Sequence, residues 1–564
     1  MEQERKQERE LESEPERRSA NNAPSSPSSS PLVSPSLSSS PSPTPRRFPI
    51  GVQTFEEVRT GYETYVDKTA YVYQLAHTGG RHYFLSRPRR FGKSLLVSTM
   101  EAYFEGRREL FEGLAIDALE TEWESRPVLR IDLSMVKTTD LAELRSQLND
   151  ALRIHEETWG RDEHALTLGS RLASLIRAAH RQTGKQVAVL VDEYDAPLLN
   201  VAHDPVQLET FRQIMREFYA PLKGCDEYLR FVFLTGITKF SQLSVFSELN
   251  NLVNISMMPQ FAGICGITQE ELVDRFSNDV DTLAAMLETT RDDAFSQLKA
   301  QYDGYHFAEK SPDVYNPFSL LNALQWGRID SYWFTSGTPT FLVNLLRRHD
   351  WDLAALEGCE ARETSFDAPT ERMDTPLPML YQGGYLTIKS FDPRRRSYRL
   401  GIPNEEVRRG LSESLVAHAA PGALETHYGF LDRFADDVTN GDMDGALKAM
   451  RAYLAGIPYH LSSRDEKGFQ TKLFLIFDLL GIQIETEFKT ATGRVDAVVA
   501  TADALYVMEF KYDRSAEEAL AQIDERGYLV PFSADGRRLF KVGVNFSSAT
   551  QTIEQWVIVE ADRA

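Results

Sequence analysis

Short apolar runs without polar alternation recur along the first half of the chain, and longer amphipathic segments separate them. The runs span residues 82–85, 128–133, 187–191 and 228–234. Continuous aliphatic runs of this length are typical of strands that are buried on both faces of a parallel sheet. Between them, residues 141–155 and 166–181 carry apolar residues at the spacing of amphipathic helices. Strands that alternate with helices predict an α/β domain on a parallel sheet, which we place at residues 47–318.

The pattern becomes mostly helical beyond residue 318. Within residues 319–455, two short strands at 385–389 and 397–400 can pair across an arginine-rich turn. Helices followed by such a hairpin predict a winged-helix-like region. Residues 413–454 predict further amphipathic helix, which we interpret as a connector to the last domain.

The last hundred residues return to strands and predict a second α/β domain at residues 456–564. Strands are expected at 494–499 and 505–511, and a helix at 470–480. The two-residue period of a strand places Glu509 and Lys511 on one face of the second strand. Farther along, a predicted helix carries Ala519, Gln522 and Ile523 on one face, with Gln522 pointing inward.

Residues 1–46 have a different composition from the rest of the chain. Residues 1–18 are mostly Glu, Arg and Gln, and residues 19–45 are mostly Ser and Pro. Such a segment buries too little apolar surface to offset its ordering entropy, so we predict a disordered tail. It is either a spacer or a target of proline-directed phosphorylation, because proline follows Ser26, Ser30, Ser34, Ser40, Ser42 and Thr44.

Charge and cysteine content limit the possible partners and compartments. A formal net charge of -21 excludes a protein-wide positive field that attracts nucleic acid. Any contact with DNA or RNA therefore requires a local basic patch, and the hairpin tip with Arg394, Arg395 and Arg396 is the candidate. A charged, solvated tip without a partner explains these arginines equally well.

Cys225, Cys265 and Cys359 show no pairing pattern, which favours a reducing interior. The sequence has no secretory-type apolar segment and no run of about 18 apolar residues, the length that spans a membrane. We therefore expect an intracellular protein, cytoplasmic or nuclear, that does not contact a membrane.

Candidate chemistry begins where the first predicted strand ends, at Arg87-Pro88-Arg89-Arg90-Phe91-Gly92-Lys93-Ser94. A strand, a tight loop and a helix in this order predict a phosphate-binding loop, whose backbone N–H groups face the anion. Its contacts would come from residues 90–95, namely Arg90, Phe91, Gly92, Lys93, Ser94 and Leu95. Lys93 is expected to reach the terminal phosphates, and the Ser94 hydroxyl to hold Mg²⁺. Arg87 replaces the usual first glycine of such a loop.

A second element supports the first. The strand at 187–191 ends in Asp192-Glu193, which are placed to hold the Mg²⁺ water shell and to polarise the attacking water, respectively. The strand at 228–234 ends near Thr235 and Thr238. Either these hydroxyls sense a γ-phosphate or they cap the end of the strand.

These motifs, in this order, resemble the AAA-ATPase-like family over residues 49–318. The further stretches that carry the resemblance are Asp192-Glu193-Tyr194-Asp195, residues 235–241, residues 246–252 and Tyr302-Asp303-Gly304-Tyr305-His306-Phe307. The family shares the arginine at the first glycine position. The resemblance implies a P-loop NTPase core that uses ATP and Mg²⁺. The role of residues 302–307 does not follow from it, and a packed turn is the simplest interpretation.

The C-terminal strands suggest a second chemical site. Asp496 and Glu509 on neighbouring strands are placed to chelate a hard cation, with Lys511 beside the attacking water. Glu466 upstream is a candidate third carboxylate, and Gln522 points toward the same face. A Glu-x-Lys pair on a strand is also common as an exposed, salt-bridged surface.

Glu466, Gly493-Arg494-Val495-Asp496, Glu509-Phe510-Lys511, Gln522 and Gly527-Tyr528 together resemble the PD-(D/E)XK nuclease superfamily, over about residues 465–545. The likeness is to the branch that is fused behind the AAA-ATPase-like domain, and it implies a restriction-endonuclease-like fold. It also implies that Asp496 and Glu509 are metal ligands, that Lys511 is the water-orienting or charge-stabilising base, and that Glu466 is an auxiliary acid.

The sequence thus predicts an ATP-binding and ATP-hydrolysing protein with a Mg²⁺-dependent nuclease domain that acts on DNA or RNA. The alternative is an NTP-switched binding or assembly module with a non-catalytic nuclease-like fold. An arginine finger is open between Arg89, Arg90 and a neighbouring subunit of a possible homo-oligomer.

Overall fold

The computed structural model describes residues 46–62, 64–239, 252–334, 356–368, 375–419, 433–434, 436–455, 483–489, 493–550 and 552–561. The predicted disordered tail, apart from its last residue, lies outside the described residues. So do Glu466, the helix predicted at 470–480 and nearly all of the stretch at 246–252.

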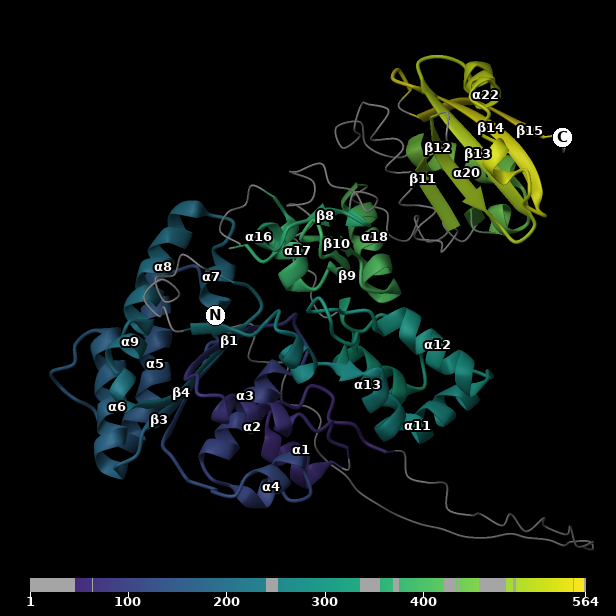
Figure 1. Ribbon diagram of the computed structural model, residues 1–564. Coiled ribbons are helices and arrows are strands. Elements are labelled where there is room, and N and C mark those ends of the chain that lie inside the picture. Colours follow the sequence, from purple (N-terminus) through teal and green to yellow (C-terminus); the bar gives the residue numbers. More distant parts are fainter. Residues whose placement is uncertain are drawn as a thin grey trace, which may run out of the picture. The chain divides into compact units, whose positions relative to one another are not determined.

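Five parallel strands form the central sheet of the first region, in the order β2-β3-β4-β1-β5 (Figure 1). Their bounds are β1 His82–Ser86, β2 Val128–Asp132, β3 Val187–Asp192, β4 Leu229–Gly236 and β5 Leu252–Asn254. The predicted parallel sheet is confirmed. Because the strands are parallel, the C-terminal ends of β1, β3 and β4 meet at one edge, where the candidate residues follow them.

Helices cover both faces of this sheet (Figure 1). One face packs against α5 Leu141–Trp159, α6 Leu168–Thr183 and α8 Pro205–Tyr219, and the other against α2 Thr69–His77, α3 Lys93–Phe104 and α4 Ala115–Leu119. Successive strand residues alternate between the two cores, as a period of two requires: Val189 faces the first and Leu190 the second. The smaller helices are α1 Phe55–Gly61, α7 Ala196–Asn200 and α9 Pro221–Gly224.

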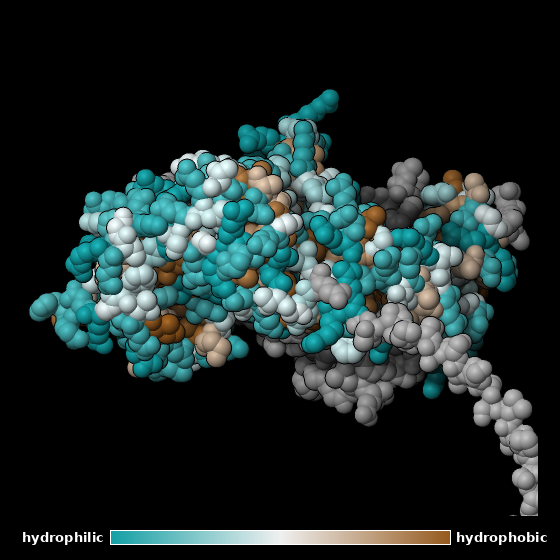
Figure 2. Space-filling model, turned by 90° about the horizontal axis from the view of Figure 1, so that it is seen from below, coloured by the Kyte–Doolittle hydropathy of each residue, from teal (hydrophilic) through white to brown (hydrophobic). Residues whose placement is uncertain are grey.

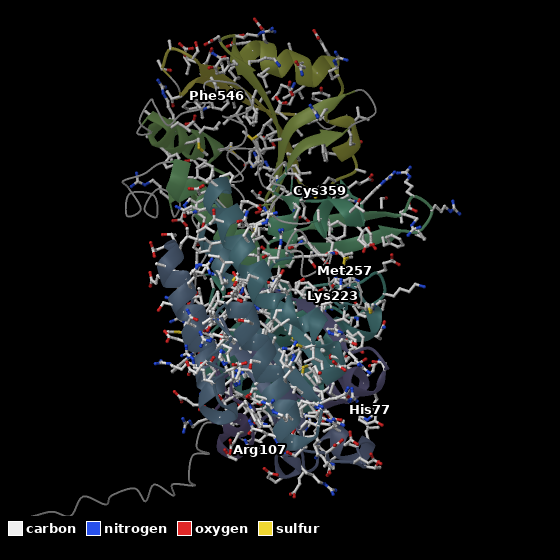
Figure 3. All side chains as sticks on the ribbon, turned by 90° about the vertical axis from the view of Figure 1, so that its left-hand side faces the viewer. His77, Arg107, Lys223, Met257, Cys359 and Phe546 are labelled. Atoms are coloured by element: carbon white, nitrogen blue, oxygen red, sulfur yellow. The ribbon has the colours of Figure 1, made fainter. Side chains whose placement is uncertain are left out.

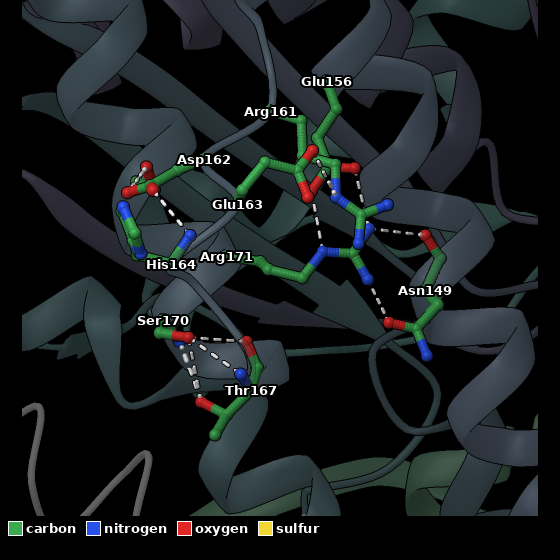
Figure 4. Close-up of polar contacts among 10 residues, drawn as sticks. Asn149, Glu156, Arg161, Asp162, Glu163, His164, Thr167, Ser170 and Arg171 are labelled. Carbon is green, nitrogen blue, oxygen red and sulfur yellow. Dashed lines mark hydrogen bonds and ion pairs between the residues drawn. The ribbon is translucent and has the colours of Figure 1, made fainter.

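A buried ion pair joins α5 to α6 (Figure 4). The Arg171 guanidinium donates from Nε to Glu156 Oε1 at 2.7 Å and from Nη2 to Glu156 Oε2 at 2.8 Å. Arg171 also donates to Asn149. The two ionic side chains are only 7% and 6% exposed, so each charge depends on the other for its solvation. A capping box between Thr167 and Ser170 starts α6.

Three helices continue the chain beyond the parallel sheet and share one apolar core: α11 Gln269–Met286, α12 Arg291–Tyr302 and α13 Pro317–Trp326. The boundary that we predicted at residues 318/319 lies inside α13. The short strands β6 Ile267–Thr268 and β7 Val314–Tyr315 pair beside them.

The predicted hairpin is confirmed as β9 Thr387–Asp392 and β10 Ser397–Gly401, which pair antiparallel. A third strand, β8 Glu360–Ala361, pairs with β10. The helices α16 Glu363–Phe366, α17 Leu377–Gly383 and α18 Glu405–Ala419 flank this small sheet in the sequence.

The C-terminal sheet is mixed, with the order β11-β12-β13-β14-β15. Its strands are β11 Gln483–Lys489, β12 Arg494–Ala500, β13 Ala504–Tyr512, β14 Arg538–Ser547 and β15 Thr552–Glu560. Only the pair β13–β14 is parallel. The helix α22 Ala516–Glu525 packs on one face with Val507 of β13, and the opposite face holds Met508, Phe510 and Phe546. Phe546 is labelled in Figure 3.

The helix α20 Met443–Ala455 packs on that opposite face of the C-terminal sheet, although we predicted it as part of a connector. Its buried residues Met443, Leu447, Met450 and Leu454 recur every three or four positions and form one apolar stripe. Within the described part of this stretch, α18 is described as far as Ala419, and Gly441 turns with a φ of 77° before α20. The domain boundary at 455/456 remains a prediction.

The face seen in Figure 2 is mostly hydrophilic, with apolar residues scattered among polar ones. Among the described residues, no helix combines the length and apolar character needed to cross a membrane.

The Glu156–Arg171 pair generates a stability prediction. Arg171→Met should lower the free energy of unfolding by about 3–5 kcal/mol, because it leaves the Glu156 carboxylate buried without its cation. Calorimetric melting would measure the change. Arg153→Met is the matched control, since Arg153 pairs with Asp150 at the surface, where such pairs contribute about 0–1 kcal/mol. Equal effects of the two substitutions would contradict this account.

Candidate active sites

The predicted phosphate loop connects β1 to α3, and two of its residues adopt left-handed backbone conformations. Gly92 precedes the helix with a φ of 91°, and Arg90 has a φ of 64°. Glycine adopts this conformation freely, whereas for arginine it is unfavourable and must be stabilised by the surroundings. The loop thus places Lys93 and Ser94 in the first turn of α3, beside the unpaired backbone N–H groups of a helix start.

Arg87, at the position of the missing glycine, is an internal anchor of the loop. Its side chain is 1% exposed and donates to the carbonyl oxygens of Ser86 at 2.9 Å, Ser256 at 2.8 Å and Phe261 at 3.2 Å. Its guanidinium lies 4.1 Å from the ring centroid of Phe307. Burial lowers the pKa of Arg87, so these acceptors are needed to keep the charge in place.

The stretch Tyr302-Asp303-Gly304-Tyr305-His306-Phe307 has a role that the sequence did not reveal. Phe91 of the phosphate loop packs against Tyr305 and Phe307, with ring centroids 4.8 and 5.7 Å apart. Gly304 has a φ of 89°, and a Cβ there would collide with the Pro403 carbonyl oxygen. The stretch therefore supports the phosphate loop from outside the parallel sheet.

The structure brings Lys93 next to the acids that end β3. Lys93 Nζ lies 3.3 Å from Glu193 Oε1 and donates to the Pro88 carbonyl oxygen at 3.3 Å. Burial raises the pKa of Asp192, and a hydrogen bond from the Ser94 hydroxyl opposes that shift. Glu193 has a left-handed φ of 49°, which is uncommon for a residue with a side chain. Four predicted site residues thus converge at the C-terminal edge of the sheet.

A cavity of about 510 Å³ opens at this edge. Residues 89–96 and Glu193 are among the residues that line it. Apolar side chains also line it, including Ile50, Val52, Phe318 and Leu321. A cavity lined by both charged and apolar residues suits a molecule that combines phosphates with an aromatic base.

Thr235, near the end of β4, and Thr238, just after it, both make hydrogen bonds inside the protein. Thr235 is fully buried and donates its hydroxyl to the Leu85 carbonyl oxygen at 2.8 Å. Thr238 donates to Asp195 Oδ2 from its backbone at 2.7 Å and from its hydroxyl at 2.5 Å. Burial and the nearby Glu193 charge raise the pKa of Asp195 to about 6. These contacts favour strand-end capping over sensing of a γ-phosphate, and they make Asp195 a clamp between β3 and β4.

A second polar cluster lies between β13 and α22. Lys511 Nζ is 3.1 Å from Glu509 Oε1 and donates to Gln522 Oε1 at 2.8 Å. Gln522 Nε2 also donates to Glu509 Oε1. Glu509 is 2% exposed, so this charge is stabilised almost entirely by its neighbours. The expected inward orientation of Gln522 and the shared face of Glu509 and Lys511 are both present.

Asp496 of β12 adds a second carboxylate to this cluster. Its Oδ2 accepts the backbone N–H of Phe510 at 2.8 Å. Burial, and then the charge of Asp496, raise the pKa of Glu509 to about 7. Glu509 Oε2 is buried and accepts no hydrogen bond from the described residues. Two close carboxylates, one with a free buried oxygen, fit a divalent cation, which would neutralise both. Within the described residues no group of three or more His, Cys, Asp or Glu side chains is arranged to hold a metal, and Glu466 lies outside them.

Comparison with known proteins matches the two regions that contain these residues. The family of predicted AAA-ATPases matches residues 49–246, and the PD-(D/E)XK nuclease superfamily matches residues 464–556. An Azotobacter chroococcum mcd 1 protein, described as an uncharacterized protein in the vnfD 5' region, is 34% identical over 529 residues, which are 91% of this chain and 99% of that protein. The chain belongs to the AAA-ATPase-like family. Its C-terminal domain is of the PD-(D/E)XK nuclease superfamily.

The AAA-ATPase-like domain also has contacts that sequence reasoning missed. Lys239, which follows the β4 clamp, pairs with Asp367 at 2.5 Å, and its backbone N–H donates to Gln382 Oε1 at 2.7 Å. Gln382 is a polar residue in the otherwise apolar helix α17, and this was the signal available in the sequence. Nothing near Gln382 in the sequence indicates that Lys239 is its partner.

The clamp that Asp195 forms between β3 and β4 of the AAA-ATPase-like domain generates a second prediction. A Cβ on Gly236 would collide with Asp195 Oδ1 and lie 2.8 Å from Tyr194 Cδ1. Gly236→Ala should therefore destabilise the domain by about 1–3 kcal/mol, the usual cost of overpacking. Gly224→Ala is the control, since a Cβ there meets nothing within 4 Å. Thermal unfolding of the two variants would compare them, and an unchanged melting temperature for Gly236→Ala would contradict the clamp.

Proposed function

We propose that this AAA-ATPase-like protein binds and hydrolyses Mg²⁺-ATP, and that its C-terminal domain is a Mg²⁺-dependent phosphodiesterase that cuts DNA or RNA. The observation that supports this most strongly is the cluster of Asp496, Glu509, Lys511 and Gln522, in which Glu509 is 2% exposed, Lys511 bonds to both Glu509 and Gln522, and Asp496 accepts the backbone N–H of Phe510. An ordinary surface salt bridge does not require a buried carboxylate or several hydrogen-bond partners for its cation.

In the ATP site, Lys93 is the contact for the β- and γ-phosphates, and Ser94 with Asp192 is the set that fits Mg²⁺. The phosphates compete with Glu193 for Lys93, because the two side chains lie 3.3 Å apart in the structure. Once Lys93 turns to the phosphates, the Glu193 carboxylate is free to accept a proton from the attacking water.

In the nuclease site, Asp496 and Glu509 are the proposed metal ligands. Mg²⁺, when bound, supplies a Lewis acid that activates water and offsets charge on the phosphate. Lys511 is the positioned cation for the negative charge that develops at phosphorus, and Gln522 holds Lys511 in place.

The hairpin tip is the proposed contact with nucleic-acid phosphates. Asp392 Oδ1 accepts the backbone N–H groups of Arg394 and Arg395 at 2.8 and 3.2 Å, which shapes the turn. Arg394, Arg395 and Arg396 are all exposed, as phosphate contacts require.

Lys93→Ala should weaken ATP binding by about 1.5–3 kcal/mol, because it removes a charge-assisted contact with the phosphates. Glu193→Gln should bind ATP at least as tightly as the wild type, since it frees Lys93 from its partner. It should also hydrolyse ATP about 10²–10⁴-fold more slowly, because the water loses its base. Calorimetry and phosphate release would measure the two effects. Wild-type turnover in Glu193→Gln would rule out this base.

Glu509→Gln and Lys511→Ala should each reduce cleavage of plasmid or single-stranded DNA or RNA by at least about 10²-fold. ATP hydrolysis should continue in both, because the two sites use different residues. Cleavage should require Mg²⁺ or Mn²⁺ and fail in Ca²⁺, whose looser coordination suits the reaction poorly. Glu525→Gln, an exposed change on the same helix as Gln522, is the control. Cleavage that survives Glu509→Gln or excess chelator would favour a binding or assembly module instead.

A further inference from the structure

The phosphate loop is held by a residue outside the segment that matches the AAA-ATPase family. The indole N–H of Trp333 donates to the backbone carbonyl oxygen of Arg89 at 3.0 Å. Arg89 directly precedes Arg90, the loop residue with the unfavourable left-handed φ of 64°. Trp333 is 5% exposed, so this hydrogen bond is largely shielded from water.

Trp333 is itself fixed from α18, the helix that follows the hairpin. Glu406 is fully buried, and its Oε1 accepts the backbone N–H groups of Tyr332 at 2.6 Å and Trp333 at 2.7 Å. Its Oε2 accepts the Ser319 hydroxyl at 2.8 Å. Burial raises the pKa of Glu406 to about 7, and hydrogen bonds from the Ser319 side chain and from the backbone of Trp333, Tyr332 and Phe334 oppose that shift. In its ionised form this carboxylate holds the backbone at Trp333 more firmly than a neutral acceptor would.

The same region also touches the loop through Gly384, which ends α17. Gly384 has a φ of 87°, and a Cβ there would lie 2.7 Å from Pro88 Cβ. The Trp333 ring packs against Tyr385, with ring centroids 5.4 Å apart. The described part of the region between Trp333 and Glu406 therefore packs closely against the loop at Pro88 and donates a hydrogen bond to it at Arg89.

We propose that Trp333 is a positioning residue for the nucleotide, which holds the Arg89 carbonyl and thereby the turn at Arg90 that presents Lys93 and Ser94 to the phosphates. This inference rests on the proposed function, because it assumes that the loop binds ATP. It makes the hairpin region part of the nucleotide site, so that occupancy of the loop and the packing of α17 and α18 depend on each other.

Trp333→Phe tests this, because it removes the N–H donor and keeps an aromatic ring. The Kd for ATP should rise about three- to tenfold, the equivalent of one neutral hydrogen bond. Trp326→Phe is the matched control. Trp326 Nε1 also donates to an oxygen, Asn322 Oδ1 at 3.2 Å, but it lies on α13 and is 66% exposed. The Kd of Trp326→Phe for ATP should lie within about twofold of the wild-type value.

Tryptophan fluorescence separates positioning from general destabilisation. ATP should change the emission of the wild type, and this change should be lost in Trp333→Phe and kept in Trp326→Phe. An unchanged Kd in Trp333→Phe, with Lys93→Ala clearly weakened in the same assay, would overturn the inference alone. A wild type that binds no ATP, or binds it no better than Lys93→Ala, would overturn the proposed function and this inference with it.

Hydrogen exchange of the wild-type protein decides the matter even if Trp333→Phe does not fold. A slowly hydrolysed ATP analogue should slow exchange at residues 88–96 and also at 331–334 and 384–386. Protection that stops at the phosphate loop would refute the inference.

Discussion

The burial of the Arg87 guanidinium is the constraint on which the position of the phosphate loop depends. A charge removed from water is tolerated only when several acceptors replace its hydration. Arg87 finds them in the carbonyl groups of Ser86, Ser256 and Phe261 and in the ring of Phe307. Because Ser256, Phe261 and Phe307 come from distant parts of the chain, Arg87 has these partners only when the surrounding segments have packed.

The same principle organises the C-terminal site. Glu509 is almost fully buried, and Lys511 and Gln522 satisfy one of its oxygens while the other has no donor among the described residues. The nearby Asp496 adds repulsion and raises the pKa of Glu509. Two carboxylates held close together repel each other and lower the stability of the fold, so their arrangement fits a cation-binding site better than a purely structural role.

The contacts of the phosphate loop and of the neighbouring strand ends extend beyond the residues that the family match covers. Trp333, Gly384 and Lys239 connect the ends of β1 and β4 to the hairpin region through hydrogen bonds, close packing and an ion pair. These contacts join residues that are far apart in the sequence, so they form only when both parts are folded. They also mean that the phosphate loop and the hairpin region are not independent modules.

The sequence by itself determined the local elements and the residue types of both sites. Apolar runs fixed the strands of the parallel sheet, and the period of two placed Glu509 and Lys511 on one face, because both signals depend only on neighbouring residues. Only the tertiary structure decided that the Thr235 hydroxyl donates to the Leu85 carbonyl oxygen of β1 and that α20 packs on the C-terminal sheet. It alone decided that residues 302–307 brace the loop. These roles depend on partners far away in the sequence, and a buried group does not reveal locally which partner satisfies it.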